Sequence, residues 1–330
     1  MAHARDQSLP RGAARPSTGV EAGRRAWRKR TLWQEIVRAR LAYLLLTPMF
    51  LAMIVFVYYP PLSALYHAFF RWDPTQATSP FVGLDNFGTV FQDPHMGQAT
   101  LNMLQLLTFS VVVGTVVPLI VAELIFAVRH VTARYAYRFL FLIPIIVPMV
   151  VTILLWRFFY DPNLGVFNAL LDAVGLGAFK QNWLGNFNTA LYALMFVGFP
   201  FVAGTSVLIY LAGLINISGE VFEAAALDGA TGLQRIIRID LPLLVGQIRL
   251  FIVLGIIGGV QAFQLQLIIS NPPGGPGWQT TVPALEMYLR AIEESKYGVA
   301  SAIGLLLFLF VLVLTILNFR LFRSTATEGA

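Results

Sequence analysis

Six long apolar runs constrain the fold of this chain more than any other feature of its sequence. Each run is longer than 20 residues and contains at most one Asp, Glu, Lys or Arg. A helix needs about 20 predominantly apolar residues to cross the hydrocarbon of a bilayer. We therefore predict an all-α integral membrane protein with six transmembrane helices, at about 41–70, 101–128, 139–159, 190–217, 243–269 and 299–319. Prolines within or near these runs predict kinks in the helices (Pro48, Pro60, Pro61, Pro118, Pro144, Pro148 and Pro200).

The composition excludes several classes of protein. Hydrophobic residues make up 57% of the chain and charged residues only 12%, whereas soluble proteins carry about 25% charged residues. The absence of cysteine excludes disulfides, thiolate metal sites and iron–sulfur clusters. Only four histidines occur, and they are scattered along the chain (His3, His67, His95 and His130). We therefore expect no metal site and no cofactor bound by this chain.

The positions of lysine and arginine predict the orientation, because positively charged loops stay on the cytoplasmic side of a membrane. Of the 23 basic residues, 17 fall on one side of the six runs, and ten of these lie in residues 1–40. Both termini are therefore predicted to be cytoplasmic. The expected organisation is a basic N-terminal tail, a first transmembrane helix, a core domain of five transmembrane helices and a C-terminal tail (1–40, 41–70, 101–320 and 321–330).

The basic tail also explains the net charge of +6, because the remainder of the chain is close to neutral. The charge is thus no indication of nucleic-acid binding. Within the tail, residues 27–40 have the pattern of a short amphipathic helix, which would lie on the anionic lipid of the inner leaflet.

The loop before the last run combines an irregular Pro/Gly segment, 270–281, with a helical pattern from 282 to 293. It lies on the predicted outer side. A lid, a docking rim and a simple connector are all compatible with this pattern.

The 218–242 segment stands out because it is apolar yet lies between two predicted spans on the cytoplasmic side. Its boundary signals divide it into two helices: an N-cap at Ser218, a left-handed end at Gly229, and a capping box at Thr231 and Gln234. The second helix is expected to carry an apolar stripe and then to meet Pro242 at the turn into the fifth span; the stripe consists of Leu233, Ile236, Ile237 and Ile239.

An apolar loop with a defined shape needs a surface that buries it. It can fold back on its own bundle, or it can dock on a partner at the cytoplasmic face. Glu220, Glu223 and Asp228 offer charges for pairing with a partner, and three consecutive alanines leave a low surface that another backbone can approach.

The same segment resembles the EAA signature of permease subunits of ATP-binding cassette importers. In that family it is the coupling helix, which inserts into a cleft of the ATPase subunit. The resemblance implies an ion pair from Glu223 to the ATPase, close contact through Ala224 and Ala225, and a turn at Gly229. The full set of coupling residues implied is Glu223, Ala224, Ala225, Asp228, Gly229, Ile239, Leu241 and Pro242.

The likeness extends over about 41–323 and implies a MetI-like type I permease fold in a bacterial plasma membrane. Several short strings are similar to carbohydrate-uptake permeases, in particular to the first of two non-identical permeases. They include Phe81 to Phe87, Leu142 to Pro144, Trp156-Arg157, Gly165 to Asn168, Trp183-Leu184 and Gly274 to Pro276. The chain lacks the large periplasmic insertion of the maltose-type member.

The energy source is expected on another chain. None of the three lysines has the glycine before it and the Ser or Thr after it that a phosphate-binding P-loop needs. We therefore predict a transporter subunit that is not an enzyme. The resemblance implies a second permease, two ATPase subunits that hold ATP and magnesium, and an extracytoplasmic sugar-binding protein.

A sugar pathway needs amides and aromatic faces more than charges, because a neutral polyol is held by hydrogen bonds and ring stacking. The fifth run offers Gln261, Phe263 and Gln264, and the two glutamines, three residues apart, would share a helix face. We predict that these residues line the cavity; hydrogen bonding between helices is the alternative. Arg249 is expected to reach the inner surface, and Glu123 is given no role beyond snorkelling or pairing.

The predicted cargo is a di- or oligosaccharide. The alternative is an importer permease for glycerol phosphate esters or polyamines. Phosphate esters would need a basic residue near the cavity, for which only Arg71, Arg157 or Arg290 are available, and polyamines would need carboxylates that the spans lack. A secondary carrier is disfavoured, because such carriers use intramembrane charges for ion coupling.

Overall fold

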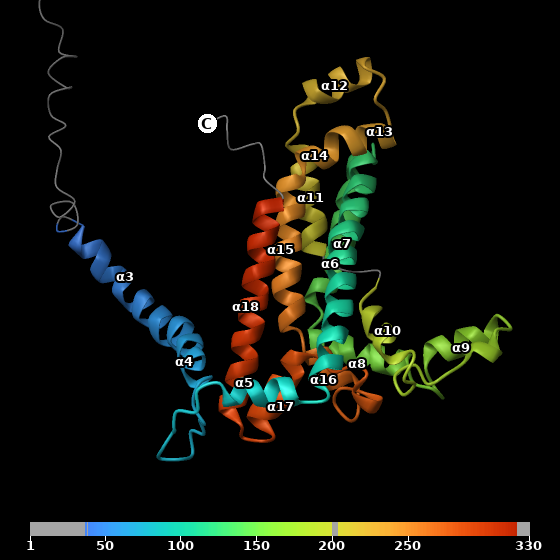
Figure 1. Ribbon diagram of the computed structural model, residues 1–330. Coiled ribbons are helices and arrows are strands. Elements are labelled where there is room, and N and C mark those ends of the chain that lie inside the picture. The colour runs from blue at the N-terminus through green and yellow to red at the C-terminus, as the bar shows by residue number, and fades with distance from the viewer. Residues whose placement is uncertain (1–36, 38, 200–203, 322–330) are drawn as a thin grey trace, which may run out of the picture. The chain divides into compact units, whose positions relative to one another are not determined.

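The computed structural model describes residues 37, 39–199 and 204–321, and within them every regular element is a helix (Figure 1). The only β pairing in this part of the chain is an isolated antiparallel bridge between Phe70 and Phe81. The predicted all-α class is confirmed. The predicted amphipathic helix at 27–40 lies almost wholly outside the described residues, as does the C-terminal tail beyond residue 321.

The chain divides into two units, which are described separately, at residues 61 and 62. The first contains an apolar helix long enough to cross a membrane, and this helix continues to His67. It corresponds to the predicted span at 41–70. Its parts are α3 (Arg40–Met53), a π-helical turn (Ile54–Tyr58) and α4 (Tyr59–His67).

The π-helical turn in this helix has a local cause. It ends at Tyr58, two residues before Pro60, and Pro60 and Pro61 lack the N–H that an α-helix would direct to the carbonyl four residues earlier. The backbone bonds shift to the i→i+5 pattern at this point, and the N–H of Tyr59 donates to the carbonyl of Ile54.

The second unit contains two further helices that are long and apolar enough to span a membrane, α6 (Met96–Ala127) and α18 (Tyr297–Leu321). Three bent pairs also qualify if each pair counts as one span, so the described residues hold three to six spans. The bent pairs are α7 (Val131–Leu142) with α8 (Met149–Phe159) at 90°, α11 (Gly204–Ile215) with α12 (Gly219–Leu227) at 71°, and α13 to α14 (Leu233–Leu243) with α15 (Val245–Gln261) at 69°.

The third and fourth predicted spans are not single helices. The third run, 139–159, contains the 90° bend between α7 and α8, with a 3₁₀ turn at Ile143–Ile146 and an extended residue at Val147. Pro144 and Pro148 cause this break, since neither can continue an α-helical ladder. The fourth run, 190–217, holds α10 (Ala190–Met195) and α11, and Pro200 lies outside the described residues.

The fifth run, 243–269, is also interrupted, although no proline or glycine stands at the break. Helix α15 ends at Gln261 and α16 (Gln264–Ile269) begins three residues later. Between them Ala262 is extended, with ψ of 124°. The N–H of Phe263 leaves the helical ladder and donates to the side-chain carbonyl of Gln264, at 3.4 Å.

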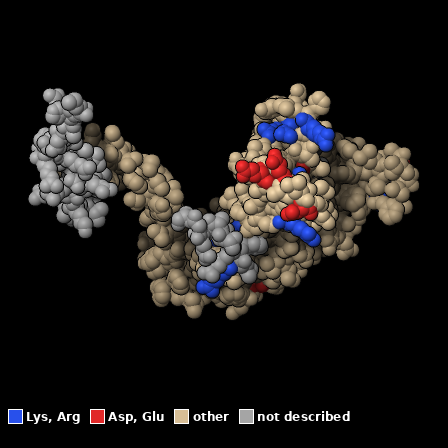
Figure 2. All heavy atoms as spheres, turned by 90° about the horizontal axis from the view of Figure 1, so that it is seen from above, with Lys and Arg blue, Asp and Glu red and all other residues tan. Residues whose placement is uncertain are grey.

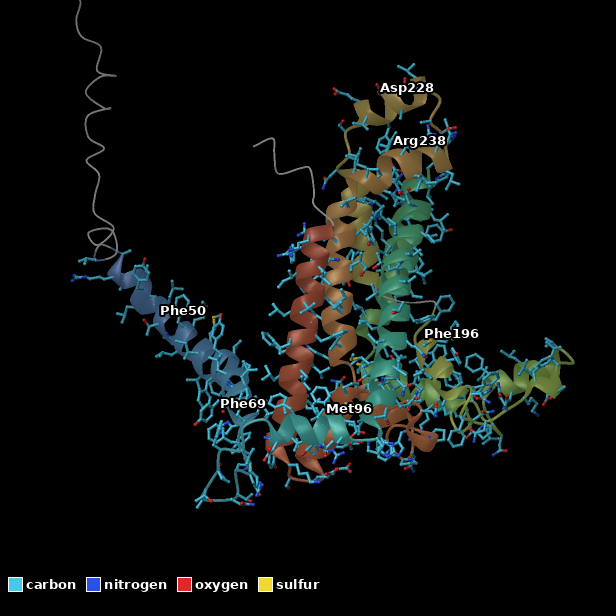
Figure 3. The ribbon with its side chains drawn as sticks, in the orientation of Figure 1. Phe50, Phe69, Met96, Phe196, Asp228 and Arg238 are labelled. Atoms are coloured by element: carbon cyan, nitrogen blue, oxygen red, sulfur yellow. The ribbon has the colours of Figure 1, made fainter. Side chains whose placement is uncertain are left out.

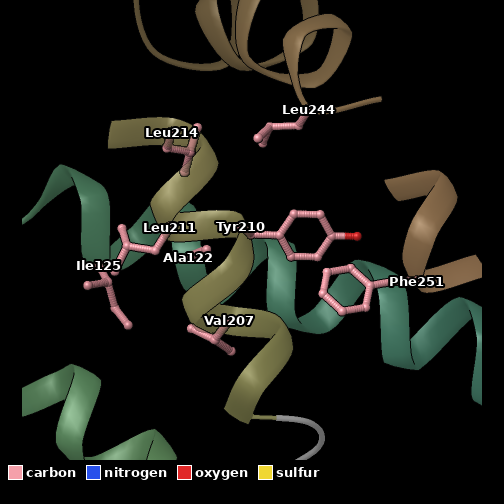
Figure 4. Close-up of a cluster of buried hydrophobic side chains, with 8 residues drawn as sticks. All are labelled: Ala122, Ile125, Val207, Tyr210, Leu211, Leu214, Leu244 and Phe251. Carbon is pink, nitrogen blue, oxygen red and sulfur yellow. The ribbon is translucent and has the colours of Figure 1, made fainter. Parts of the chain in front are cut away.

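The bundle core joins α6 and α11 to the start of the fifth run. Eight buried side chains form it, with the ring of Tyr210 against that of Phe251 at 4.8 Å between centroids (Figure 4). They are Ala122, Ile125, Val207, Tyr210, Leu211, Leu214, Leu244 and Phe251. Because lipid is as apolar as these side chains, close packing rather than removal from water holds such helices together.

Close approach of backbones supports this packing. A Cβ added at Gly259 of α15 would lie 2.7 Å from Leu107 of α6, and one at Gly204 of α11 would lie 2.0 Å from the carbonyl oxygen of Phe141. Neither position can hold a larger residue without a shift of its neighbour.

The second unit has two distinct ends (Figure 1). Helices α12, α13 (Leu233–Arg235) and α14 (Leu241–Leu243) lie at one, which we call the α12 end. Helices α5 (Asp85–Gln92) and α17 (Pro283–Ile292) lie at the other, the α17 end. The remaining elements are α9 (Val166–Ala173), two 3₁₀ turns (Gly177–Phe179 and Pro276–Trp278) and a π-helical turn (Ile236–Asp240).

Candidate functional site

The 218–242 segment projects from the bundle at the α12 end as two short helices joined by a turn (Figures 1 and 3). Ser218 occupies the N-cap position of α12, as predicted, but its side chain makes no capping hydrogen bond. Helix α12 ends at Leu227, and Gly229 is left-handed with φ of 75°. The N–H groups of Ala230 and Gly229 donate to the carbonyls of Ala225 and Ala226 at 2.9 and 3.1 Å. This is a Schellman turn, and the predicted role of Gly229 in it is confirmed.

The start of the second helix differs from the prediction. The N-cap is Gly232, with φ of 54° and ψ of −124°, and no side-chain capping bond is present. The capping box of Thr231 and Gln234 is therefore wrong, because the left-handed glycine moves the helix start one residue further on. In the predicted apolar stripe, Leu233 is 69% and Ile237 is 55% exposed, whereas Ile236 and Ile239 are half-buried.

A π-helical turn, Ile236–Asp240, interrupts the second helix before it reaches α14. As in the first unit, the turn ends two residues before a proline, here Pro242. The chain then bends by 69° into α15. Ile239 and Leu241 are half-buried within this bend, and Pro242 is exposed.

The side chains of α12 face in two directions. Glu223, Ala224 and Asp228 are exposed, and Leu227 is 90% exposed. Ala225 is only 6% exposed, so it packs against its own chain and is unavailable to another protein in this conformation. Viewed from this end, acidic and basic side chains lie close together on a mostly uncharged surface (Figure 2), and Asp228 and Arg238 both lie there (Figure 3).

Beneath this exposed surface the segment is tied to α6 by charges. Arg235 lies 2.9 Å from Asp240 and 3.4 Å from Glu123. Glu123 is thus paired, as one of the two expectations had it. Its partner, Arg235, was not predicted from the sequence. Arg249, expected to snorkel, lies over the ring of Phe319 at 4.0 Å.

The three predicted pathway residues lie together. Gln261, Phe263 and Gln264 line one cavity of about 630 Å³, with residues of α8, α17 and α18 on its other walls (Met149, Met287 and Phe308 among them). Phe263 stacks on Tyr288 at 5.2 Å. The two glutamines do not share a helix face as predicted, because the break at Ala262 separates them.

A second cavity, of about 380 Å³, adjoins the same break. Gln266 of α16 and Ser110 of α6 are among its lining residues. Gln266 is 3% exposed, and its side-chain carbonyl has no hydrogen-bond donor among the described residues.

The predicted irregular segment and following helix are both present at the α17 end, where α17 spans Pro283–Ile292. The segment is pinned to the bundle by Asn102 of α6, which is fully buried and donates to the carbonyls of Thr281 and Trp278 at 2.9 and 3.3 Å. Trp278 also stacks on His95 at 4.7 Å.

Charged residues fasten α17 itself. Arg290 contacts Asp93 and lies 3.0 Å from Glu294 and 3.8 Å from Glu286. Glu286 is 4% exposed, and burial raises the pKa of its carboxyl above the ordinary value, while Arg290 opposes the rise. These contacts make the α17 end a packed structure.

The arrangement contains no grouping of at least three His, Cys, Asp and Glu residues that could hold a metal ion, within the residues the structure describes.

Residues 114–326, well over half of the chain, match the family described as binding-protein-dependent transport system inner membrane component. The chain belongs to this family.

Known relatives of the permease cover most of its length. The diacetylchitobiose uptake system permease protein NgcF of Streptomyces coelicolor is 31% identical, over 82% of this chain and 79% of the relative. The sn-glycerol-3-phosphate transport system permease protein UgpA of Escherichia coli is 30% identical, over 88% of this chain and 96% of the relative. A crystal structure of a bacterial alginate ABC transporter, in complex with an alginate pentasaccharide-bound periplasmic protein, contains a chain with a TM-score of 0.78 and 26% identity, which covers 91% of this permease and 99% of that chain.

These findings confirm the resemblance to permeases of ATP-binding cassette importers and the MetI-like fold. The protein is a multi-pass membrane permease and not an enzyme. The matched region includes the 218–242 segment and the residues around the break at Ala262.

Proposed function

We propose that this permease forms the translocation pathway of an ATP-driven importer of di- or oligosaccharides and couples to a separate ATPase through the 218–242 segment. The observation that carries the coupling is the shape of that segment. Helix α12 projects beyond the bundle, its Schellman turn fixes the tip, and Glu223, Ala224 and Asp228 of the EAA signature are exposed together.

The cargo is proposed from the cavity at the break in the fifth run. Its described lining offers the amides of Gln261 and Gln264 and the ring of Phe263, and it contains no charged side chain. Amides and an aromatic face suit a neutral sugar. The names of NgcF and of the alginate transporter support a carbohydrate cargo.

The likeness to UgpA keeps glycerol phosphate esters as the second candidate. A phosphate ester needs a basic group, yet Arg157 lies within 3.4 Å of the carbonyl of Ile268, and Arg290 is engaged by three carboxylates. Arg71 lines a separate pocket beside α5. Polyamines fit less well, because no carboxylate is among the described residues of the cavity wall.

The proposed assembly has this permease beside a second one, two ATPase subunits that carry ATP and magnesium, and an extracytoplasmic sugar-binding protein. The α12 end, with both termini, faces the cytoplasm, and the α17 end faces outward. The alternation of basic residues along the sequence supports this orientation, and the periplasmic protein in the alginate transporter complex supports the external partner.

Glu223→Lys tests the coupling. The reversed charge is expected to lower ATP hydrolysis stimulated by sugar-loaded binding protein by about tenfold or more, because loss of a desolvated charge pair costs roughly 2 kcal/mol or more. The measurement is ATPase activity of the reconstituted complex. Glu220→Lys, an exposed charge reversal one turn earlier in α12 and outside the EAA signature, is the matched control, because the proposed pairing depends on the signature position. Normal stimulation in Glu223→Lys, or equal loss in both variants, would contradict the proposed role of Glu223.

A further inference from the structure

Arg235 lies where three parts of the permease meet at the α12 end: α6, α12 and the π-helical turn. The geometry points to a joint, in which Arg235 with Glu123, Asp240, Phe126 and Phe222 fastens α12 to α6 and carries a movement of α12 into the bundle. We call these five residues the Arg235 joint. The inference rests on the proposed function, since it concerns how the coupling segment acts on the spans.

Two carboxylates hold the guanidinium of Arg235. Its Nε donates to Asp240 at 2.9 Å and its Nη2 to Glu123 of α6 at 3.4 Å. The side chains of Asp240 and Glu123 are 0% and 8% exposed, and that of Arg235 is 28% exposed. Water is therefore largely absent from the two carboxylates, and charge pairs in such surroundings are strong and directional.

Two aromatic rings hold the same guanidinium from α6 and α12. The Cζ of Arg235 lies 5.6 Å from the ring centroid of Phe126 in α6 and 5.4 Å from that of Phe222 in α12. The two rings are themselves 5.7 Å apart. A cation close to two ring faces is attracted by both, so Phe222 brings α12 into a contact that already joins α6 to the π-helical turn.

The π-helical turn makes the pairing possible. Arg235 and Asp240 are five residues apart, and in a regular α-helix, at about 100° per residue, they would point roughly 140° apart. The i→i+5 bonding of Ile236–Asp240 places them on one side. Pro242, a residue of the EAA signature, withholds the N–H that would restore the α-helical pattern.

The joint matters because the backbone connections of α12 are weak on both sides. Two left-handed glycines, Gly229 and Gly232, follow it, and a sharp bend of 71° precedes it. A short helix linked in this way transmits a displacement poorly through its backbone. Side-chain contacts to α6 supply a stiff route, and α6 runs the whole length of the bundle to the α17 end.

The test uses Phe222→Ala, because truncating Arg235 would leave two buried carboxylates unpaired and disturb folding. Phe222→Ala removes only the contact of α12 with the joint and leaves the charges paired. Val221→Ala, a truncation at the neighbouring exposed position of α12, is the matched control. Each variant is assembled with its ATPase and second permease in proteoliposomes, with sugar-loaded binding protein.

In Phe222→Ala the ATPase is expected to stay bound and active, while sugar transported per ATP falls at least about fivefold, the lower end of typical coupling between sites. Val221→Ala should behave as the unaltered permease. The joint is refuted by equal transport per ATP in the two variants. It is also refuted by loss of the bound ATPase in Phe222→Ala, since Phe222 would then belong to the docking surface.

A distance measurement separates this inference from the proposed function. Because the chain has no cysteine, spin labels at Glu220→Cys in α12 and Leu124→Cys in α6 report one distance. In the otherwise unaltered permease, that distance is expected to stay constant when ATP binds. In a permease that also carries Phe222→Ala, the distance is expected to change when ATP binds. A change on ATP binding without Phe222→Ala overturns the joint, whereas failure of the Glu223→Lys test overturns the coupling role itself.

Discussion

At the scale of single residues, Gly229 shows how one position shapes the exposed tip of the 218–242 segment. Its φ of 75° allows two N–H groups beyond α12 to reach carbonyls of its last turn. A residue with a Cβ is strained in this conformation by about 1–2 kcal/mol. Gly219, in the first turn of α12, has no such constraint, because its φ is not positive and a Cβ would meet nothing within 4 Å.

Gly229→Ala is therefore expected to destabilise the tip by about 1–2 kcal/mol, whereas Gly219→Ala should be neutral or stabilising by about 0.5–1 kcal/mol. Hydrogen exchange of the α12 amides in the purified permease measures both effects. Equal protection of α12 in the two variants would contradict this account of the turn.

At the scale of elements, the two π-helical turns share one arrangement. Each ends two residues before a proline, Pro60 in the first unit and Pro242 in the second. The missing N–H explains why the backbone bonds shift there. The break between α15 and α16 has a different origin, since a glutamine side chain accepts the N–H that leaves the ladder.

Helix α17 is fastened by a cluster whose protonation affects stability. Burial raises the pKa of Glu286 above its ordinary 4.5, so the folded protein binds this proton more tightly than the unfolded chain. The favourable contribution of Glu286 is then present at low pH and is lost as the pH rises from 4.5 through the raised value.

Glu286→Gln, which is neutral at every pH, is expected to gain stability relative to the unaltered permease as the pH rises. Thermal unfolding of both proteins between about pH 4 and pH 8 measures this difference. Glu293→Gln, at an exposed position just after α17, is the control and should show no comparable trend. A difference for Glu286→Gln that is constant over this range would refute the effect of burial.

At the scale of the whole molecule, transport depends on the cavity at the break in the fifth run. The double variant Gln261→Ala with Gln264→Ala removes two amides that can bind a sugar. Each neutral hydrogen bond contributes roughly 0.5–1.5 kcal/mol, so uptake at low sugar concentration should fall about tenfold. Gln247→Ala, in the other end of α15 and outside the cavity wall, is the control. Unchanged uptake and sugar preference in the double variant would remove these residues from the pathway.

Local patterns in the sequence predict much of this fold. The long apolar helices, α17 and the turn at Gly229 each depend on residues close together in the chain, and the structure has them. The start of the second helix at Gly232 was harder to predict, because Thr231 and Gln234 offered a competing signal. The break at Ala262 has no proline or glycine to mark it.

Contacts between distant residues lay beyond the reach of a single sequence. Glu123 and Arg235 are 112 residues apart, and their pairing depends on how α6 packs beside the 218–242 segment. Asp240 lies inside an apolar pattern, and only the π-helical turn explains why it faces Arg235. The sequence correctly predicts that Gln261 and Gln264 line the same cavity. The predicted reason, a shared face of one helix, is wrong, because the break at Ala262 puts the two glutamines in different helices.

The two-sided exposure of α12 has a consequence for exchanging the ATPase. Outward-facing residues, Glu223, Ala224, Leu227 and Asp228, are available to a partner, whereas Ala225 and Phe222 belong to the packing of the permease itself. If the proposed function holds, recognition of the ATPase and transmission of the movement of α12 to the bundle thus depend on different residues of one short helix. Adapting this permease to a foreign ATPase is a problem of redesigning exposed side chains of α12 while the inward face stays untouched.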